Sequence, residues 1–266
     1  MKIFLSADLE GISTTNSWGD CSPEGANYNS SKVQLTKEVS AACLGAFDAG
    51  AKHIVVKDAH KFGNNIIASE LPDNVFLRSR WSDSPLCMVE GLDNSFDAAI
   101  FIGYHSAAGK SGNTLSHTIS QKVSFIKINN IIASEFLIFS YASAYLGVPV
   151  LYLSGDKELC NDSKNMFPNL VVTPVKESDF GSTISYPVES VLKSIREDVK
   201  SALSINFKDK HIIELPTSFN VEIRYKNHYD SEKPAYYPGV ERIDDYSINF
   251  KTNDYFEVLR MLNFTV

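Results

Sequence analysis

The strongest constraint on the fold is a regular alternation of short apolar runs with helical segments over the first 155 residues. The run AAIFIG at 98–103 is typical of a strand at the centre of a sheet, and KIFLSA at 2–7 is typical of a buried strand. This alternation favours an α/β domain in which a mainly parallel central sheet is flanked by helices. We predict strands over 2–7, 53–57, 75–79, 98–103 and 149–156, and helices over 32–49 and 134–146.

Local signals refine this outline. Ser31 and Gln34 form a candidate capping box for the first long helix, and Asn129–Asn130 is a candidate turn of a β-hairpin. After residue 155 the pattern is less regular, with helices expected over 187–204 and 253–263, strands over 211–215 and 218–224, and a polar loop over 225–247. We therefore predict a metal-binding catalytic α/β domain over 1–205 and a smaller C-terminal α+β subdomain over 206–266.

Composition narrows the function classes. The net charge of −7 argues against a nucleic-acid partner, because neutralising phosphates requires a basic face. The sequence contains neither an 18-residue apolar stretch nor a signal-peptide pattern, so we expect no association with a membrane. The four cysteines are scattered without a CxxC motif, which indicates free thiols in a reducing, cytoplasmic environment.

Acids and histidines follow three of the predicted strands. Asp8 and Glu10 come after the first strand, His60 after the second, and His105 after the run at 98–103. Ligands of open α/β sheets bind at the carboxyl ends of the strands, so these side chains are expected to meet at one edge. The alternative interpretation is that each is an ordinary solvated or hydrogen-bonded residue at a strand end.

The pair Asp8 and Glu10 raises a question of charge. Side chains at positions i and i+2 of an extended segment share one face, so the two carboxylates would repel each other. A divalent cation between them would remove this repulsion. Nearby histidines favour zinc or a similar transition metal over magnesium.

An ordered set of motifs supports a resemblance to a known family. The chain resembles the D-aminopeptidases of the DppA type, peptidase family M55, over roughly residues 1–180. The motifs that carry this resemblance are SADLEG (6–11), KDAH (57–60), MVEGLD (88–93), GYH (103–105), SHT (116–118), Glu135 and PVLYLSGD (149–156).

The resemblance implies a zinc-dependent aminopeptidase with two Zn²⁺ ions per subunit that activate a water. It implies ring-shaped homodecamers and short peptide substrates with D-residues at the N-terminus, such as D-Ala-D-Ala. Carried over by position, Asp8 would bridge the two ions, and the catalytic residue beside them would be His117. The remaining implied ligands are Glu10 and His60 at one ion, and His105 and Glu135 at the other.

Two other functions start from the same opening segment. The stretch FLSADLEGIST also resembles the nucleophile motif of haloacid-dehalogenase-type phosphatases, in which Asp8 would be the nucleophile and magnesium the metal. Against this alternative, the second acid is Glu10 and the histidines would have no role. A non-catalytic zinc-binding ring scaffold is the third possibility, although structural zinc sites are usually rich in cysteine.

Overall fold

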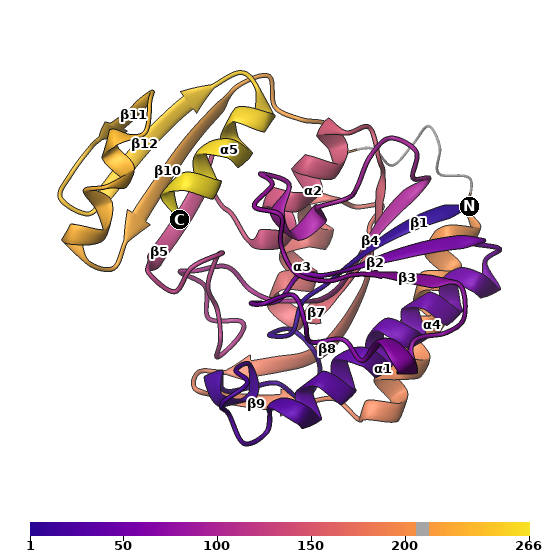
Figure 1. The fold of residues 1–266 in the computed structure, drawn as a ribbon. Coiled ribbons are helices and arrows are strands. Elements are labelled where there is room, and N and C mark those ends of the chain that lie inside the picture. Colours follow the sequence, from indigo (N-terminus) through magenta and orange to yellow (C-terminus); the bar gives the residue numbers. More distant parts are fainter. Residues whose placement is uncertain (206–212) are drawn as a thin grey trace.

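The computed structural model describes residues 1–205 and 213–266, which form two β-sheets and five α-helices (Figure 1). The larger sheet has the order β3-β2-β1-β4-β7-β8-β9. Its neighbours pair in parallel except at β8 and β9, which form an antiparallel pair. Its strands are β1 Lys2–Ala7, β2 His53–Asp58, β3 Val75–Arg78, β4 Ala98–Tyr104, β7 Val150–Asp156, β8 Val171–Asp179 and β9 Ser182–Ser185. The predicted mainly parallel α/β architecture is confirmed.

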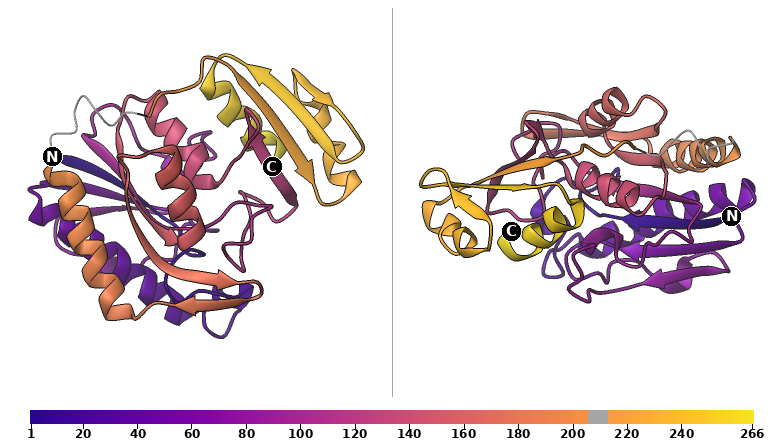
Figure 2. Two further views of the ribbon diagram at one scale, coloured as in Figure 1. Left: turned by 180° about the vertical axis from the view of Figure 1, so that it is seen from behind. Right: turned by 90° about the horizontal axis from the view of Figure 1, so that it is seen from above.

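Helices cover both faces of this sheet. Leu5 and Ile100 point to the face that carries α1 (Tyr28–Asp48) and α4 (Val188–Ser204), which lie side by side in Figure 2. The alternate residues, such as Phe4 and Phe101, pack on the opposite face against α2 (Glu135–Tyr145). Helix α3 (Lys157–Met166) contacts β7 and β8. The strands are therefore buried on both faces, as their apolar runs predict.

The first helix begins a turn earlier than predicted. Its N-cap is Asn27, and Ser31 lies inside the helix, where its hydroxyl donates to the Asn27 carbonyl. Gln34 donates to Ser13 and Glu38 instead of closing a capping box. The predicted capping box is wrong because both side chains make contacts within the folded protein that a local pattern does not reveal.

The second sheet is antiparallel and has the order β11-β12-β10-β5-β6. Its strands are β5 Val123–Ile128, β6 Ile131–Ile132, β10 Phe219–Tyr225, β11 Val240–Arg242 and β12 Ser247–Thr252. β5 and β6 form the predicted hairpin, and Asn129 and Asn130 adopt the positive φ angles that such a turn requires. The division at residue 205 stays a prediction, and this sheet takes β5 and β6 from before it.

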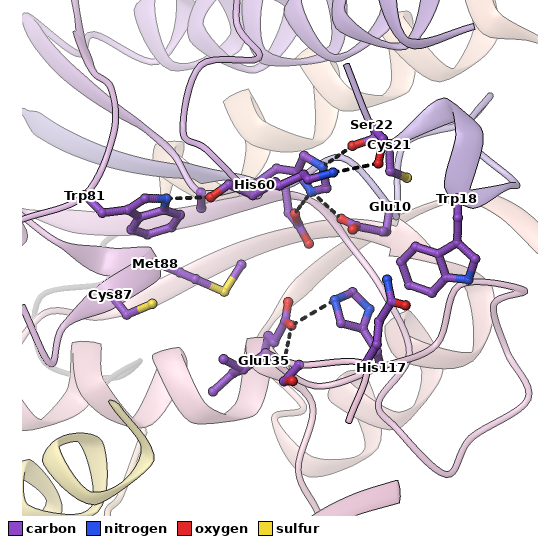
Figure 3. A pocket seen from close by; sticks show the side chains of 16 residues that line it. Glu10, Trp18, Cys21, Ser22, His60, Trp81, Cys87, Met88, His117 and Glu135 are labelled. Carbon is purple, nitrogen blue, oxygen red and sulfur yellow. Dashed lines mark hydrogen bonds and ion pairs between the residues drawn. The ribbon is translucent and has the colours of Figure 1, made fainter. Parts of the chain in front are cut away.

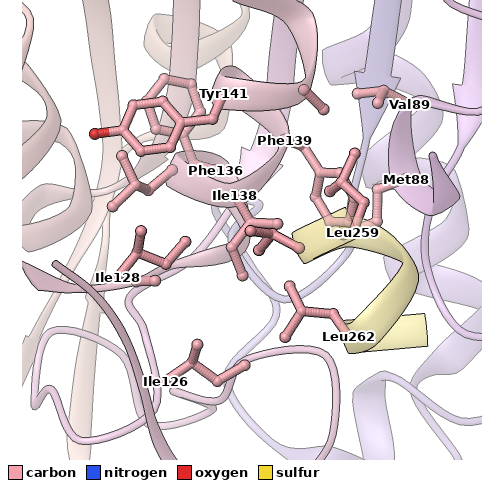
Figure 4. Close-up of a cluster of buried hydrophobic side chains, with 14 of the residues drawn as sticks. Met88, Val89, Ile126, Ile128, Phe136, Ile138, Phe139, Tyr141, Leu259 and Leu262 are labelled. Atoms are coloured by element: carbon pink, nitrogen blue, oxygen red, sulfur yellow. The ribbon is translucent and has the colours of Figure 1, made fainter. Parts of the chain in front are cut away.

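An apolar core joins the two sheets (Figure 4). Ile126 and Ile128 of β5 belong to the same cluster as Ile138 of α2 and Leu259 of the C-terminal helix α5 (Tyr255–Thr265). The Tyr255 hydroxyl donates to the Ile138 carbonyl at 2.6 Å. The antiparallel sheet is thereby fastened to the helix that begins at Glu135.

Several elements were not predicted. β8, β9, β11 and β12 are strands that the sequence patterns do not reveal, and 247–252 was assigned partly to the polar loop. The predicted strand over 211–215 lies partly outside the described residues, and residues 213–215 form no strand. Short 3₁₀ helices cover Trp18–Asp20, Ala68–Glu70, Cys87–Val89, His228–Ser231 and Pro234–Tyr236. No helix of the described residues is long and apolar enough to span a bilayer.

Candidate metal centre

The carboxyl edge of the parallel sheet gathers the predicted site residues, of which Figure 3 labels Glu10, His60, His117 and Glu135. Asp8 and Glu10 follow β1, and His60 and His105 follow β2 and β4, which flank β1 in the sheet. Glu135 is the first residue of α2 and points back to this edge. All five side chains are buried. The structure thus brings together residues that are more than 100 positions apart in the sequence.

Asp8 lies between two histidines. Its Oδ1 is 3.4 Å from His60 Nδ1, and its Oδ2 is 3.4 Å from His105 Nε2. The Leu9 amide donates to Oδ1, whereas Oδ2 is buried without a hydrogen-bond partner among the described residues. The two oxygens therefore face different sides of the centre.

Each side has a further carboxylate. Glu10 Oε2 is 2.8 Å from His60 Nδ1, and Glu135 Oε2 is 3.2 Å from His105 Nε2. The potential ligand atoms of Asp8, Glu10 and His105 lie within 4.8 Å of one another, and so do those of His105, His117 and Glu135. These two clusters of potential metal ligands overlap, because His105 belongs to both.

Main-chain carbonyls orient all three imidazole rings. His60 Nε2 lies 2.9 Å from the Cys21 carbonyl, His105 Nδ1 lies 3.0 Å from that of Ser106, and His117 Nδ1 lies 3.0 Å from that of Leu115. A carbonyl only accepts, so in each ring this nitrogen carries the proton. The other nitrogen, which faces the carboxylates, then presents a lone pair when the ring is neutral. Metal-ligating histidines are held in this way.

The charges at the centre perturb the pKa values of the ligands. Burial would lower the pKa of His60 and His105, but nearby carboxylates, mainly Glu10 for His60 and Glu135 for His105, raise both well above the ordinary value. Burial and the neighbouring Glu10 raise the pKa of Asp8. Burial would also raise the pKa of Glu10 and Glu135, yet the histidines lower it.

This donor set fits a divalent transition metal. Three buried carboxylates offer negative charge, and two or three imidazoles offer nitrogen ligands. The buried atoms Asp8 Oδ2 and His105 Nε2 make no hydrogen bond among the described residues. Buried polar atoms normally have a partner, so two such atoms side by side point to an ion as the missing partner.

Two glycines allow the backbone to pack closely at this edge. The Gly11 amide donates to the Gly103 carbonyl at 2.8 Å, and a Cβ on Gly11 would lie 1.8 Å from the Tyr104 carbonyl oxygen. Gly103 has a φ of +71°, in the left-handed region that glycine adopts without strain. The segments that carry Glu10 and His105 can approach each other only because these positions lack side chains.

A buried polar cluster lies beneath the centre. Lys176 of β8 and Asn113 both donate to the Glu10 carbonyl, at 2.5 and 3.1 Å. Asp156, at the end of β7, accepts hydrogen bonds from Ser106 and Asn113. A lysine or asparagine is ordinarily exposed, so no sequence signal marked Lys176 or Asn113 as support for the site.

His117 borders the open side of the centre. Its ring stacks on that of His105, with centroids 4.4 Å apart and planes 8° apart, and its Nε2 lies 3.7 Å from Glu135 Oε1. Trp18 packs edge-on against the His117 ring, with ring centroids 5.3 Å apart. The His117 side chain is 12% exposed, whereas the His105 side chain is not exposed at all. His117 can therefore meet a bound molecule.

A cavity of about 450 Å³ opens above these residues, which is within the range of small-molecule sites. Its walls include the apolar side chains of Trp18, Trp81 and Met88, as Figure 3 shows. The polar part of its lining is formed by Asp8, Glu10, His60, His117 and Glu135, whereas the fully buried His105 does not line it. Such a cavity suits a small ligand with one polar, reactive end.

The chain is similar to known proteins over nearly its whole length. The family model described as D-aminopeptidase, peptidase M55, matches residues 1–264. A D-aminopeptidase of Bacillus subtilis (strain 168) is 27% identical over 264 residues, which cover 98% of this chain and 95% of that protein. A solved structure is described as the Zn-dependent D-aminopeptidase DppA from Bacillus subtilis, a self-compartmentalizing protease. It superposes with a TM-score of 0.91 at 27% identity and covers the same shares of the two chains.

Proposed function

The chain belongs to the M55 family of D-aminopeptidases and is a metallo-aminopeptidase, and on this premise we propose that it hydrolyses short peptides with a D-amino acid at the N-terminus. D-Ala-D-Ala is the model substrate of this proposal. The observation that carries it is the pair of metal-ligand clusters that share His105 and lie at the base of a cavity of suitable size.

We assign two zinc ions to each subunit. Glu10 and His60 would hold one ion, and His105 and Glu135 the other. Asp8 would bridge them, since its two oxygens face different histidines. The zinc-dependence of the neighbouring solved structure supports the choice of metal. When bound, zinc would supply Lewis acidity and a water acidic enough to ionise near neutral pH.

The protein's own residues have separate tasks in this reaction. The buried carboxylates and imidazoles would hold the metal ions, and the free amino end of the substrate would lie at this centre, which favours cleavage next to the N-terminus. His117 Nε2 is the nitrogen that carries no hydrogen bond to the main chain, so it can hold a proton and deliver it to the leaving amine. The Leu115 carbonyl keeps the ring facing the centre during this transfer.

We also propose that the chain is cytoplasmic and assembles as a homo-oligomer, a ring-shaped decamer, with the centre facing an enclosed space. The support is the neighbour described as self-compartmentalizing. Such an enclosure would admit short peptides and keep longer chains and folded proteins away from the centre. Light scattering of the purified protein measures the number of subunits directly.

The decisive experiment combines metal analysis with three assays. The proposal requires about two zinc ions per chain and cleavage of D-Ala-D-Ala in preference to L-Ala-L-Ala. The His117→Ala variant should keep its zinc and lose about 100-fold or more in kcat, which is the usual contribution of a general acid–base group. His53→Ala is the matched control, because His53, at the start of β2, packs against Phe76 and does not belong to the centre.

The other outcomes discriminate between the alternatives. Hydrolysis of p-nitrophenyl phosphate with magnesium would indicate the phosphatase. Stoichiometric zinc without turnover of any peptide would indicate the scaffold. Full activity in His117→Ala would remove the assigned role of this residue.

A further inference from the structure

The cavity above the centre has an uneven distribution of charge. Its described lining contains the three carboxylates of Asp8, Glu10 and Glu135, and Lys61 is the only lysine or arginine among these residues. A short peptide carries a positive charge at one end and a negative charge at the other. With its amino end at the metal centre, its carboxylate would lie along the cavity wall away from the metal ligands, where a cationic partner would stabilise it.

Lys61 has a defined position on the cavity wall. Its Nζ donates to the Ser22 hydroxyl at 2.6 Å, and Ser22 also lines the cavity. An ammonium group has three N–H donors, and a hydroxyl that accepts one hydrogen bond can still donate its own proton. Lys61 and Ser22 therefore form a small binding site that offers a carboxylate both an ammonium and a hydroxyl hydrogen-bond donor.

The backbone at Lys61 is built to present this side chain. The residue has a φ of +46°, an uncommon conformation for a residue other than glycine. The Trp81 indole donates to the Lys61 carbonyl at 2.6 Å, and the Gly63 amide donates to the His60 carbonyl at 2.8 Å. Strain of this kind persists where the surrounding structure enforces it, often beside an active site.

We infer that Lys61, with Ser22, binds the C-terminal carboxylate of the peptide substrate and so determines the length of peptide that the enzyme prefers. This inference rests on the proposed aminopeptidase function. The substrate's amino end would lie at the metal centre and its carboxylate at Lys61, with the scissile bond between them. A dipeptide satisfies both ends within one cavity, whereas a longer peptide carries its carboxylate beyond Lys61.

The test compares D-Ala-D-Ala with its C-terminal amide, in zinc-loaded wild-type, Lys61→Met, Lys61→Arg and Lys52→Met proteins. Wild-type protein should prefer the acid. Lys61→Met should lower kcat/KM for the acid by about tenfold, chiefly through KM, and change that for the amide by less than about twofold. Lys61→Arg should recover part of the loss, because it keeps the charge. Lys52, an exposed lysine outside the cavity, is the control.

Each result has a distinct meaning. An equal loss on acid and amide in Lys61→Met, or no loss on either, overturns the role of Lys61 while leaving the aminopeptidase function intact. Wild-type protein that cleaves neither compound overturns the proposed function, and this inference with it. Zinc content is measured in every variant because Lys61 follows His60 directly. A fall in zinc that accounts for the lost activity also overturns the role.

Discussion

Replacing Asp156 by asparagine should destabilise the protein far more than the small change in shape suggests. Asp156 is fully buried and caps α3. Its Oδ1 accepts the Leu159 amide at 2.9 Å, and its Oδ2 accepts the Ser106 amide at 2.6 Å. Neither amide can turn away, because both belong to the main chain. An asparagine must therefore place its NH₂ group against one of these donors in either orientation.

The magnitude follows from this geometry. A buried donor left without a partner costs about 1–3 kcal/mol, and the charge that strengthens the remaining bonds is also lost. We expect a loss of about 3 kcal/mol in the free energy of unfolding, which corresponds to a decrease in Tm of about 6–12 °C for a chain of this size. Urea and thermal unfolding of the zinc-loaded protein measure both quantities.

Asp254→Asn is the matched control. Asp254 caps α5, is exposed, and accepts the Phe256 amide through Oδ1, so an asparagine oxygen can replace it at a cost of about 0.5 kcal/mol or less. If Asp156→Asn costs no more than 1 kcal/mol beyond this control, the two-donor argument is refuted. Because Ser106 follows His105, the variant should also retain zinc less tightly than wild-type protein.

Two further predictions concern the centre itself. The raised pKa values of His60 and His105 favour the positively charged, doubly protonated form of both rings in the metal-free protein. Zinc binds only a ring nitrogen that has lost its proton, so binding must release a proton from each ring. Zinc affinity should rise with pH by up to about tenfold per unit for each displaced proton, as titrations at pH 6, 7 and 8 would measure; an affinity that does not change with pH contradicts this. Gly11→Ala would place its Cβ 1.8 Å from the Tyr104 carbonyl oxygen, so it should lower the free energy of unfolding by about 3 kcal/mol or more. Gly181→Ala is the control, since nothing lies within 4 Å of its Cβ position, and equal urea midpoints for the two variants would disprove the clash.

The sequence was most informative where chemistry follows directly from local pattern. Asp8, Glu10, His60 and His105 were selected because each comes after a segment with the signature of a strand, and parallel strands end at a common edge. Glu135 and His117 lie farther from any such strand end. His117 still falls beside the strand-end region, and Glu135 stands at the junction of the predicted hairpin and helix. Their roles as catalytic residue and metal ligand came from the resemblance to a family.

The parts that escaped prediction depend on contacts between distant segments. β5 pairs with β10, which lies about 90 residues farther along the chain, and the residues of neither strand indicate that it pairs with the other. β12 is a short strand that begins in a polar stretch and is stabilised by neighbours on both sides. Lys176 reads as a surface residue until β8 is placed beside β7 and its ammonium group reaches the Glu10 carbonyl.

The anchoring of the three histidine rings by main-chain carbonyls bears on how this centre tolerates mutation. The acceptors belong to Cys21, Ser106 and Leu115, but they are peptide oxygens and every amino acid would supply them. Side-chain replacement at these three positions cannot delete the acceptor itself. Residues 21, 106 and 115 can therefore be substituted without loss of the hydrogen bonds that orient the imidazole rings, as long as the backbone keeps its path.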